Sequence, residues 1–177
     1  SMTIAKVQGN TTDFLMPPLS SLELTVGFLA GAATRGILVG AVTLVSIGLL
    51  GAADISVQHV VPLAFYAFVA SMFMAAVGLM GGIWAEKFDH LAAVTNFVVL
   101  PLTMLSGTFY PIIVFMEPFQ TLSHFNPFFH LIDGFRFAFT GQAEGNLMLG
   151  AVYVTGLTLV LSLLCWMMFR SGYKLKA

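Results

Sequence analysis

Long stretches without charge constrain this chain more than any other feature. There are four, of 18, 26, 26 and 25 residues, and they lie between Arg35 and Asp54, His59 and Glu86, His90 and Glu117, and Glu144 and Arg170. A helix needs about 20 mostly apolar residues to cross a bilayer. The stretches are continuous rather than alternating, which favours helices over barrel strands. The sequence therefore predicts an all-α integral membrane protein with four transmembrane helices.

Composition supports a membrane protein and excludes several other classes. Of the 177 residues, 58% are hydrophobic and 8% are charged, whereas a soluble domain carries about 25% charged residues. The net charge of −1 provides no basic surface for nucleic acid. Cys165 is the single cysteine, so it is expected to pack in the core rather than form a disulfide. His124 and His130 are six residues apart and do not share a helical face; no metal site is expected.

The charges also divide the chain into segments. Residues 1–10 form a leader that begins with "SM", which resembles a cloning scar, and no signal peptide is recognisable. The spans are predicted at 24–53, 60–85, 91–110 and 146–169, followed by a tail at 170–177. Arg35 is expected near one end of the first span, where its side chain can reach water.

Basic residues predict the orientation of the spans. An even number of spans puts both termini on one side, together with six basic residues: Lys6, Arg35, Lys87, Arg170, Lys174 and Lys176. The other side has only Arg136. Because cytoplasmic loops are enriched in Lys and Arg, both termini are predicted to be cytoplasmic.

No energy source or catalytic motif is evident in the chain. The deep interior of the last three spans has no Asp, Glu, Lys or Arg, although ion-driven transporters usually bury such groups. There is no phosphate-binding GxxxxGK[ST] loop, HExxH, GxSxG or pair of carboxylates. The chain is therefore not expected to be an enzyme, and any transport would use energy from a partner.

A short cytoplasmic segment precedes the first span. Thr11 or Thr12 can cap a helical turn, and Pro17 with Pro18 ends it. Ser20 and Glu23 then match a capping box that starts the next helix. Residues 11–23 are therefore either an interfacial anchor on lipid or a docking element for a soluble subunit.

The stretch FNPFFHLIDGFRFAFTG (125–141) predicts a helix that does not cross the membrane. Asn126 suits the N-cap, Pro127 the first helical position and Gly141 the C′ position. The intervening 14 residues span about 21 Å, less than the hydrocarbon core of about 30 Å. Asp133 and Arg136 are three apart and can pair on the helix surface. An apolar stripe consists of Phe128, Leu131, Ile132, Phe135 and Phe139. We expect residues 111–141 to form outer interfacial or re-entrant helices.

Small residues recur at four-residue spacing in the first span. Gly27 and Gly31 form one pair, and Gly36 and Gly40 another. Such spacing allows close helix contact in lipid. It predicts either packing within the chain or a seam between two copies.

Taken together, these segments resemble the permease subunit of type-2 ABC exporters. "DFLMPPLSSLE" (13–23) resembles the coupling helix of that family, and "LPLTMLSGTFYPI" (100–112) resembles its fifth span. FNPFFHLIDGFRFAFTG resembles its outer re-entrant helices. The family usually has six spans, so the chain would supply the last four, and either truncation or upstream residues would account for the first two.

The resemblance implies an assembly in the bacterial inner membrane. Two permeases would pair, and each would contact an ATP-binding cassette subunit that holds MgATP, with no cofactor in this chain. Closure of those subunits would export a lipid, a lipid-linked glycan or polysaccharide, or a hydrophobic drug. The alternative is a scaffold that recruits a cytoplasmic partner without transport.

The resemblance also implies roles for individual residues. Docking would use the coupling helix, through Asp13, Phe14, Leu15, Met16, Pro17, Leu19 and Glu23. An outer gate would use Gly107, Tyr110, Pro111, Asn126, Pro127, Asp133, Gly134, Arg136 and Gly141, although Gly107 and Pro111 could equally mark the end of the third span. Polar span residues either line the path or bond to backbone carbonyls of nearby helices; these are Thr95, Asn96, Thr103, Ser106 and Thr108.

Overall fold

The computed structural model describes residues 19–51, 56–85, 87–108 and 123–173. These residues form helices, with no strand among them. In chain order the helices are α3 (Ser21–Leu49), α4 (Val60–Trp84), α5 (Phe88–Val94), the π-helix η1 (Thr95–Val99), α6 (Leu100–Met104), α8 (Pro127–Thr140) and α9 (Leu147–Ser171). The expected all-α architecture is confirmed for this part of the chain.

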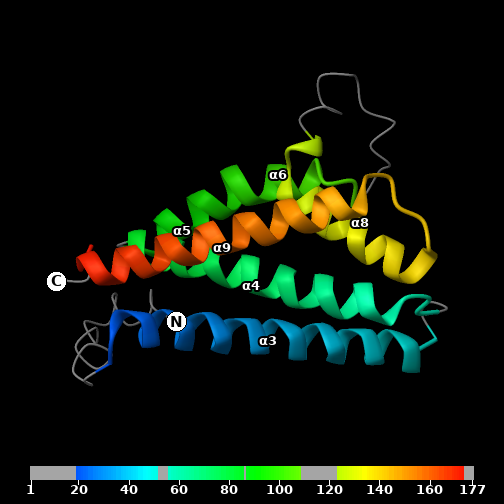
Figure 1. The fold of residues 1–177 in the computed structure, drawn as a ribbon, viewed down its shortest axis with the longest axis horizontal. Coiled ribbons are helices and arrows are strands. Elements are labelled where there is room, and N and C mark those ends of the chain that lie inside the picture. Colours follow the sequence, from blue (N-terminus) through cyan, green and yellow to red (C-terminus); the bar gives the residue numbers. More distant parts are fainter. Residues whose placement is uncertain (1–18, 52–55, 86, 109–122, 174–177) are drawn as a thin grey trace.

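Three long helices form the body of the molecule. α3, α4 and α9 run roughly side by side along the long axis in Figure 1, and each contacts the other two. α3 begins, and α4 and α9 both end, at the same end of the bundle, which we call the α5 end. α8 lies at the other end, against the first turns of α4 and α9, and we call this the α8 end.

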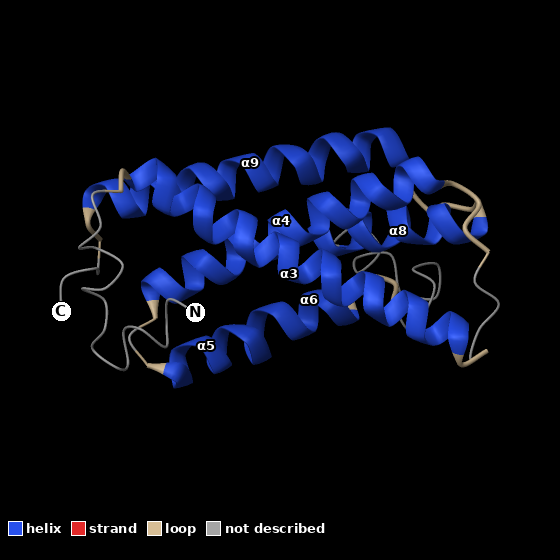
Figure 2. Ribbon diagram, turned by 90° about the horizontal axis from the view of Figure 1, so that it is seen from below, coloured by secondary structure: helices blue, strands red, loops and turns tan. Residues whose placement is uncertain are grey.

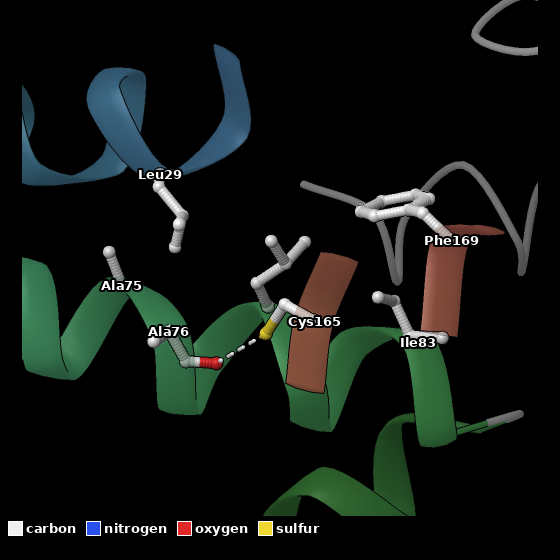
Figure 3. Close-up of a cluster of buried hydrophobic side chains, with 7 residues drawn as sticks. Leu29, Ala75, Ala76, Ile83, Cys165 and Phe169 are labelled. Atoms are coloured by element: carbon white, nitrogen blue, oxygen red, sulfur yellow. Dashed lines mark hydrogen bonds between the residues drawn. The ribbon is translucent and has the colours of Figure 1, made fainter. Parts of the chain in front are cut away.

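The core at the α5 end is built around small side chains of α4. Ala75 and Ala76 lie between Leu29 of α3 and Cys165 of α9, as Figure 3 shows. Cys165 is fully buried, and its thiol donates a hydrogen bond to the Ala76 carbonyl at 3.4 Å. Small residues let helix backbones approach closely when lipid provides no hydrophobic drive. The structure thus confirms that Cys165 packs in the core.

Within the described part of the chain, three helices are long and apolar enough to span a membrane: α3, α4 and α9. The third predicted span, 91–110, corresponds to a shorter helical run, Phe88–Met104. Its 17 residues extend about 25 Å, less than a hydrocarbon core of about 30 Å. A span at 91–110 therefore stays a prediction, and its expected end at residues 109–110 lies outside the described residues.

Proline explains the irregular centre of this run. Pro101 has no backbone N–H, so the carbonyl of Phe97, four residues earlier, loses its α-helical donor. The Leu100 N–H instead bonds to the Thr95 carbonyl five residues back. The helix is therefore locally widened into a π turn, which lies between α5 and α6 in the run labelled in Figure 2.

The position of Arg35 within α3 differs from the expected one. The helix is continuous over 29 residues, and Arg35 is 14 residues from each end instead of near one of them. The side chain is exposed. The Ser20 cap starts the helix at Ser21, as the capping box predicted, and this early start leaves Arg35 in its middle.

Glycines of α3 differ in how closely a neighbouring helix approaches them. A Cβ at Gly36 would lie 3.1 Å from Ser71 Oγ on α4, so Gly36 permits close packing within the chain. Gly27, Gly31 and Gly40 have open space where a Cβ would lie. Of the two interpretations, intrachain packing applies to Gly36.

Candidate functional site

The ends of α8 form as its sequence predicts. The Asn126 side chain accepts a hydrogen bond from the Phe128 N–H, and Pro127 is the first helical residue. Gly141 ends the helix with φ of 70°, a left-handed conformation that glycine adopts without steric cost. The helix has 14 residues, about 21 Å, as its caps predict.

Close contact with α4 fixes the position of α8. The Tyr66 ring of α4 lies against the backbone of Gly134, where a Cβ would be only 2.4 Å from three ring atoms. The Tyr66 hydroxyl then donates to the Leu147 carbonyl at the start of α9, at 3.1 Å. One aromatic side chain therefore joins α4, α8 and α9.

The C-terminal half of α8 is also held by the segment before α4. The backbone N–H groups of Gln58 and His59 both donate to the Ala138 carbonyl, at 3.0 and 3.1 Å. The His59 ring stacks on Phe137 with centroids 4.7 Å apart. α8 therefore packs on protein along its length and does not lie free on lipid.

The Asp133 carboxylate organises the connection from α8 to α9. It is 3% exposed, and its two oxygens accept hydrogen bonds from the backbone N–H groups of Glu144 and Gly145, at 2.8 and 2.9 Å. A buried carboxylate needs such donors to offset its lost hydration. The expected pair with Arg136 is present, with Arg136 Nη1 4.0 Å from Asp133 Oδ1, but Asp133 is buried and not on the helix surface.

Arg136 connects three segments at the α8 end. Its Nη1 lies 2.5 Å from Glu144 Oε1 in the connection to α9. Its Nη2 donates at 2.7 Å to the carbonyl of Gly107, just after α6. Gly107 is buried with φ of 77°, so its turn directs the carbonyl in a way that other residues adopt only with strain.

Asn126 adds a second bond between α6 and α8. While its Oδ1 caps α8, its Nδ2 donates to the carbonyl of Leu102. We call Asn126, Asp133, Arg136 and Glu144 the α8 clamp. Together they bind the end of α6 and the start of α9 to one short helix.

The structure brings together much of the predicted outer gate. The contacts described above link four of these residues to one another or to shared neighbours: Gly107, Asn126, Asp133 and Arg136. Gly134 packs on α4. Pro127 and Gly141 delimit α8. Tyr110 and Pro111 lie outside the described residues.

The predicted path-lining residues are more dispersed. The hydroxyl of Thr103 bonds to the Val99 carbonyl at 2.8 Å, and Ser106 is fully buried with its hydroxyl on the Thr103 carbonyl. Both hydroxyls thus bond to backbone carbonyls, the second of the two interpretations given for the polar span residues. Thr108 is exposed, with its hydroxyl 2.7 Å from that of Ser106. Thr95 and Asn96 are exposed on η1.

The predicted docking element is described only at its end. Asp13, Phe14, Leu15, Met16 and Pro17 lie outside the described residues. Leu19 is exposed. The capping box is confirmed: the Ser20 side chain accepts from the Glu23 N–H, and the Glu23 carboxylate accepts from the Ser20 N–H at 2.7 Å.

Two contributors to this site were missed by the sequence analysis. Tyr66 stands out as a hydroxyl within the apolar second stretch, and a buried Tyr usually finds a partner for that hydroxyl. Glu144 is the next acidic residue after Asp133, but only the fold returns it to Arg136. Among the described residues, no group of three His, Cys, Asp or Glu side chains could hold a metal ion. In the described residues, the contacts of this site hold α6, α8 and the start of α9 in place relative to one another.

Comparison with known proteins gives a family match. The model of the family described as "ABC-2 type transporter" matches residues 1–140. "Inner membrane transport permease YadH" of Escherichia coli (strain K12) is 30% identical over 174 residues, which cover 98% of this chain and 67% of that permease. "Nodulation protein J" of Neorhizobium galegae is 26% identical over 150 residues, covering 83% of this chain and 56% of that protein. No solved structure matches.

Proposed function

This chain belongs to the ABC-2 type transporter family, and from that premise we propose that it forms the membrane part of an ATP-driven exporter. A separate ATP-binding cassette subunit supplies the energy and holds MgATP. The cargo is a lipid, a lipid-linked glycan or polysaccharide, or a hydrophobic drug. The permease functions as a pair of copies in the inner membrane, with both ends of this chain on the cytoplasmic side.

The extent of the family match carries this proposal. Residues 1–140 include the predicted docking segment at 11–23, the helices α3 to α6 and α8. A transport permease that is 30% identical over 98% of the chain supports the same activity. The match therefore supports a permease better than a scaffold that only recruits a partner.

The capping box suggests how movement enters the membrane. Ser20 and Glu23 fix the first turn of α3 through reciprocal hydrogen bonds, so a force on residues 11–19 is transmitted to a rigid helix end. α3 contacts both α4 and α9. In this proposal, closure of the ATP-binding subunits displaces α3, and the displacement reaches the α8 end through α4 and α9.

The α8 clamp has a defined part in this proposal. Arg136 joins the turn after α6 to the segment before α9. These two elements therefore move with α8 as a unit, or the bond to Gly107 breaks when they separate. The α8 end faces outward, so the clamp controls the exit side.

Reconstitution of the full-length permease with its ATP-binding subunit tests the proposal. We expect ATP-dependent export of labelled lipid or dye from vesicles. The double variant Phe14→Asp, Leu15→Asp should lose both co-purification of the subunit and stimulated ATPase activity.

A matched control introduces the same two charges at the C-terminal end of α3. Leu49 and Leu50 are 83% and 81% exposed, and Leu49→Asp, Leu50→Asp should keep the partner. Binding that survives in the Phe14, Leu15 variant contradicts the docking site. Binding without ATP-dependent transport in the unaltered protein favours the scaffold.

A further inference from the structure

A positive charge lies at the middle depth of the helical bundle. Arg35 of α3 is adjacent to Gly36, where a Cβ would lie 3.1 Å from Ser71 Oγ on α4. Ser71 is 11 residues after the start of α4 at Val60 and 13 before its end at Trp84, about 17 and 20 Å of helix. In a hydrocarbon core of about 30 Å, Arg35 is therefore near the centre.

No described residue neutralises this charge. Arg35 is exposed and makes no ion pair or hydrogen bond to another described residue. Glu23 is on the same helix but 12 residues earlier, about 18 Å along the axis. The other described acidic residues, Asp89, Asp133 and Glu144, lie towards the two ends of the bundle. Charged side chains within a membrane are costly, and they usually pair or mark the path of a substrate.

A hollow between α3 and α4 lies beside this arginine. Arg35 borders it, because it is three residues after one lining residue and directly before another. The hollow has a volume of about 340 Å³. Its lining is mostly small, which leaves room for a ligand next to the guanidinium. The lining residues are Ala32 and Gly36 of α3 and Ala70, Ser71, Met74 and Ala75 of α4.

Ser71 supplies a second donor at the same depth. Its hydroxyl makes no hydrogen bond to another described residue. The hydroxyls of α3 differ in this respect: those of Thr34, Thr43 and Ser46 each donate to the carbonyl four residues earlier, at 2.7–2.8 Å. A hydroxyl that is not bonded within its own helix is available to a ligand. The hollow therefore has a guanidinium at its border and a free hydroxyl in its lining.

These donors suit a phosphate group. A guanidinium presents its N–H groups as a planar fork that binds two phosphate oxygens at once, and the hydroxyl can donate to a third. A resident phospholipid keeps its phosphate in the headgroup region, outside the hydrocarbon core. A phosphate therefore meets Arg35 only while its molecule is being moved across the bilayer. An uncharged drug gains nothing from the arginine.

We propose that Arg35 and Ser71 form a transit site for the phosphate of a lipid-anchored cargo. Leu38, Val39 and Val42 follow Arg35 by three, four and seven residues and are 58–66% exposed, so the acyl or prenyl chain of the cargo stays in lipid along the same face of α3. The inference rests on the proposed exporter. It narrows the cargo to amphiphiles that carry a phosphate and names the residues that recognise it.

Binding of hexadecyl phosphate tests the site. The full-length permease with its ATP-binding subunit is kept in an uncharged detergent, and the radiolabelled probe is titrated. We expect saturable binding that neither excess hexadecanol nor excess inorganic phosphate displaces, because the site requires the chain and the charge together. Displacement by hexadecanol contradicts recognition of the phosphate, and displacement by inorganic phosphate contradicts a lipid-anchored ligand.

Substitutions then locate the binding. Arg35→Gln should weaken it by about 10- to 150-fold, the loss expected for hydrogen bonds to a charged group. Arg35→Lys should keep part of it, since an ammonium group retains the charge without the fork. Ser71→Ala should weaken it by about 2- to 10-fold. The control is Arg170→Gln, which removes the same charge from an exposed position in the last turn of α9. Equal affinities of Arg35→Gln and Arg170→Gln overturn the site.

Labelling of Cys165 shows whether each variant keeps its fold, because this thiol is buried in the core. If Arg35→Gln labels quickly, the arginine also holds part of the protein in place, and Ser71→Ala decides the question. Weaker binding in a slowly labelled Ser71→Ala protein supports the site, and unchanged binding overturns it.

Transport separates this inference from the proposed function. If the unaltered complex exports with ATP while Arg35→Gln still binds hexadecyl phosphate normally, the transit site is wrong and the exporter assignment stands. If the unaltered permease neither binds an ATP-binding subunit nor exports, the proposed function fails as well.

Discussion

The contact between Gly134 and Tyr66 supports a quantitative prediction. Gly134→Ala puts a methyl group where three Tyr66 ring atoms would be 2.4 Å away, whereas carbon atoms pack best at about 3.5–4.0 Å. The ring or α8 must therefore shift by about 1 Å or more. Such a shift also strains the bond from the Tyr66 hydroxyl to Leu147.

A second glycine isolates the cost of this contact. Ala is favoured over Gly in a helix by about 1 kcal/mol, and this gain applies equally to Gly156→Ala in α9, where a Cβ has nothing within 4 Å. The difference between the two variants therefore reports overpacking, which typically costs about 1–3 kcal/mol. For a chain of this size, Gly134→Ala should therefore melt about 2–12 °C below Gly156→Ala.

Cys165 provides the assay. The thiol is buried between α4 and α9, so it reacts with a thiol-reactive fluorophore only when that core opens. Heating the purified protein in detergent with the dye gives a melting curve for each variant. If Gly134→Ala melts at the same temperature as Gly156→Ala, or above it, the contact of α8 with Tyr66 is not as described.

Three further substitutions test other parts of the structure. Arg136→Lys should lower the melting temperature and slow ATP-dependent transport, because an ammonium group cannot reproduce the two-sided contact with Glu144 and Gly107; equal transport rates would contradict the clamp. Asn126→Ala should destabilise by about 1–2 kcal/mol, since it removes a helix cap and a second bond; thermal melting with the same dye measures this. Ser20→Ala should destabilise by about 0.5–2 kcal/mol and reduce partner-stimulated ATPase activity, and an unchanged ATPase rate would show that the capping box does not transmit force.

Local sequence patterns predicted the helical elements well where short-range physics decides them. The caps of α8 depend on residues within three positions of each other, so Asn126, Pro127 and Gly141 could be read directly. The same is true of the box formed by Ser20 and Glu23. The long helices α3, α4 and α9 follow from the length of the apolar stretches. Backbone N–H and C=O groups in lipid must bond to one another, and a helix achieves this within one segment.

The third span shows where a pattern of charges is insufficient. An uncharged stretch of 26 residues predicted a helix at 91–110, but the described helix ends at Met104 and contains a π turn. Hydropathy does not register the missing N–H of Pro101, nor the left-handed turn at Gly107. Pro101 lies within the run beside the π turn, and the left-handed turn at Gly107 follows the end of the helix, before the uncharged stretch ends.

The sequence by itself determined that this protein is helical, belongs in a membrane and has a 14-residue helix between two caps, because apolar length and caps act locally. Only the tertiary structure decided the partners of its polar groups. Asp133 and Arg136 are three residues apart, and spacing predicted that they pair with each other. In the fold the two lie 4.0 Å apart, but Asp133 is buried on the backbone N–H groups of residues 144–145 and Arg136 also reaches Glu144 and Gly107. Burial imposes this choice, because each charge removed from water must be met by the donors or acceptors that distant segments bring to it.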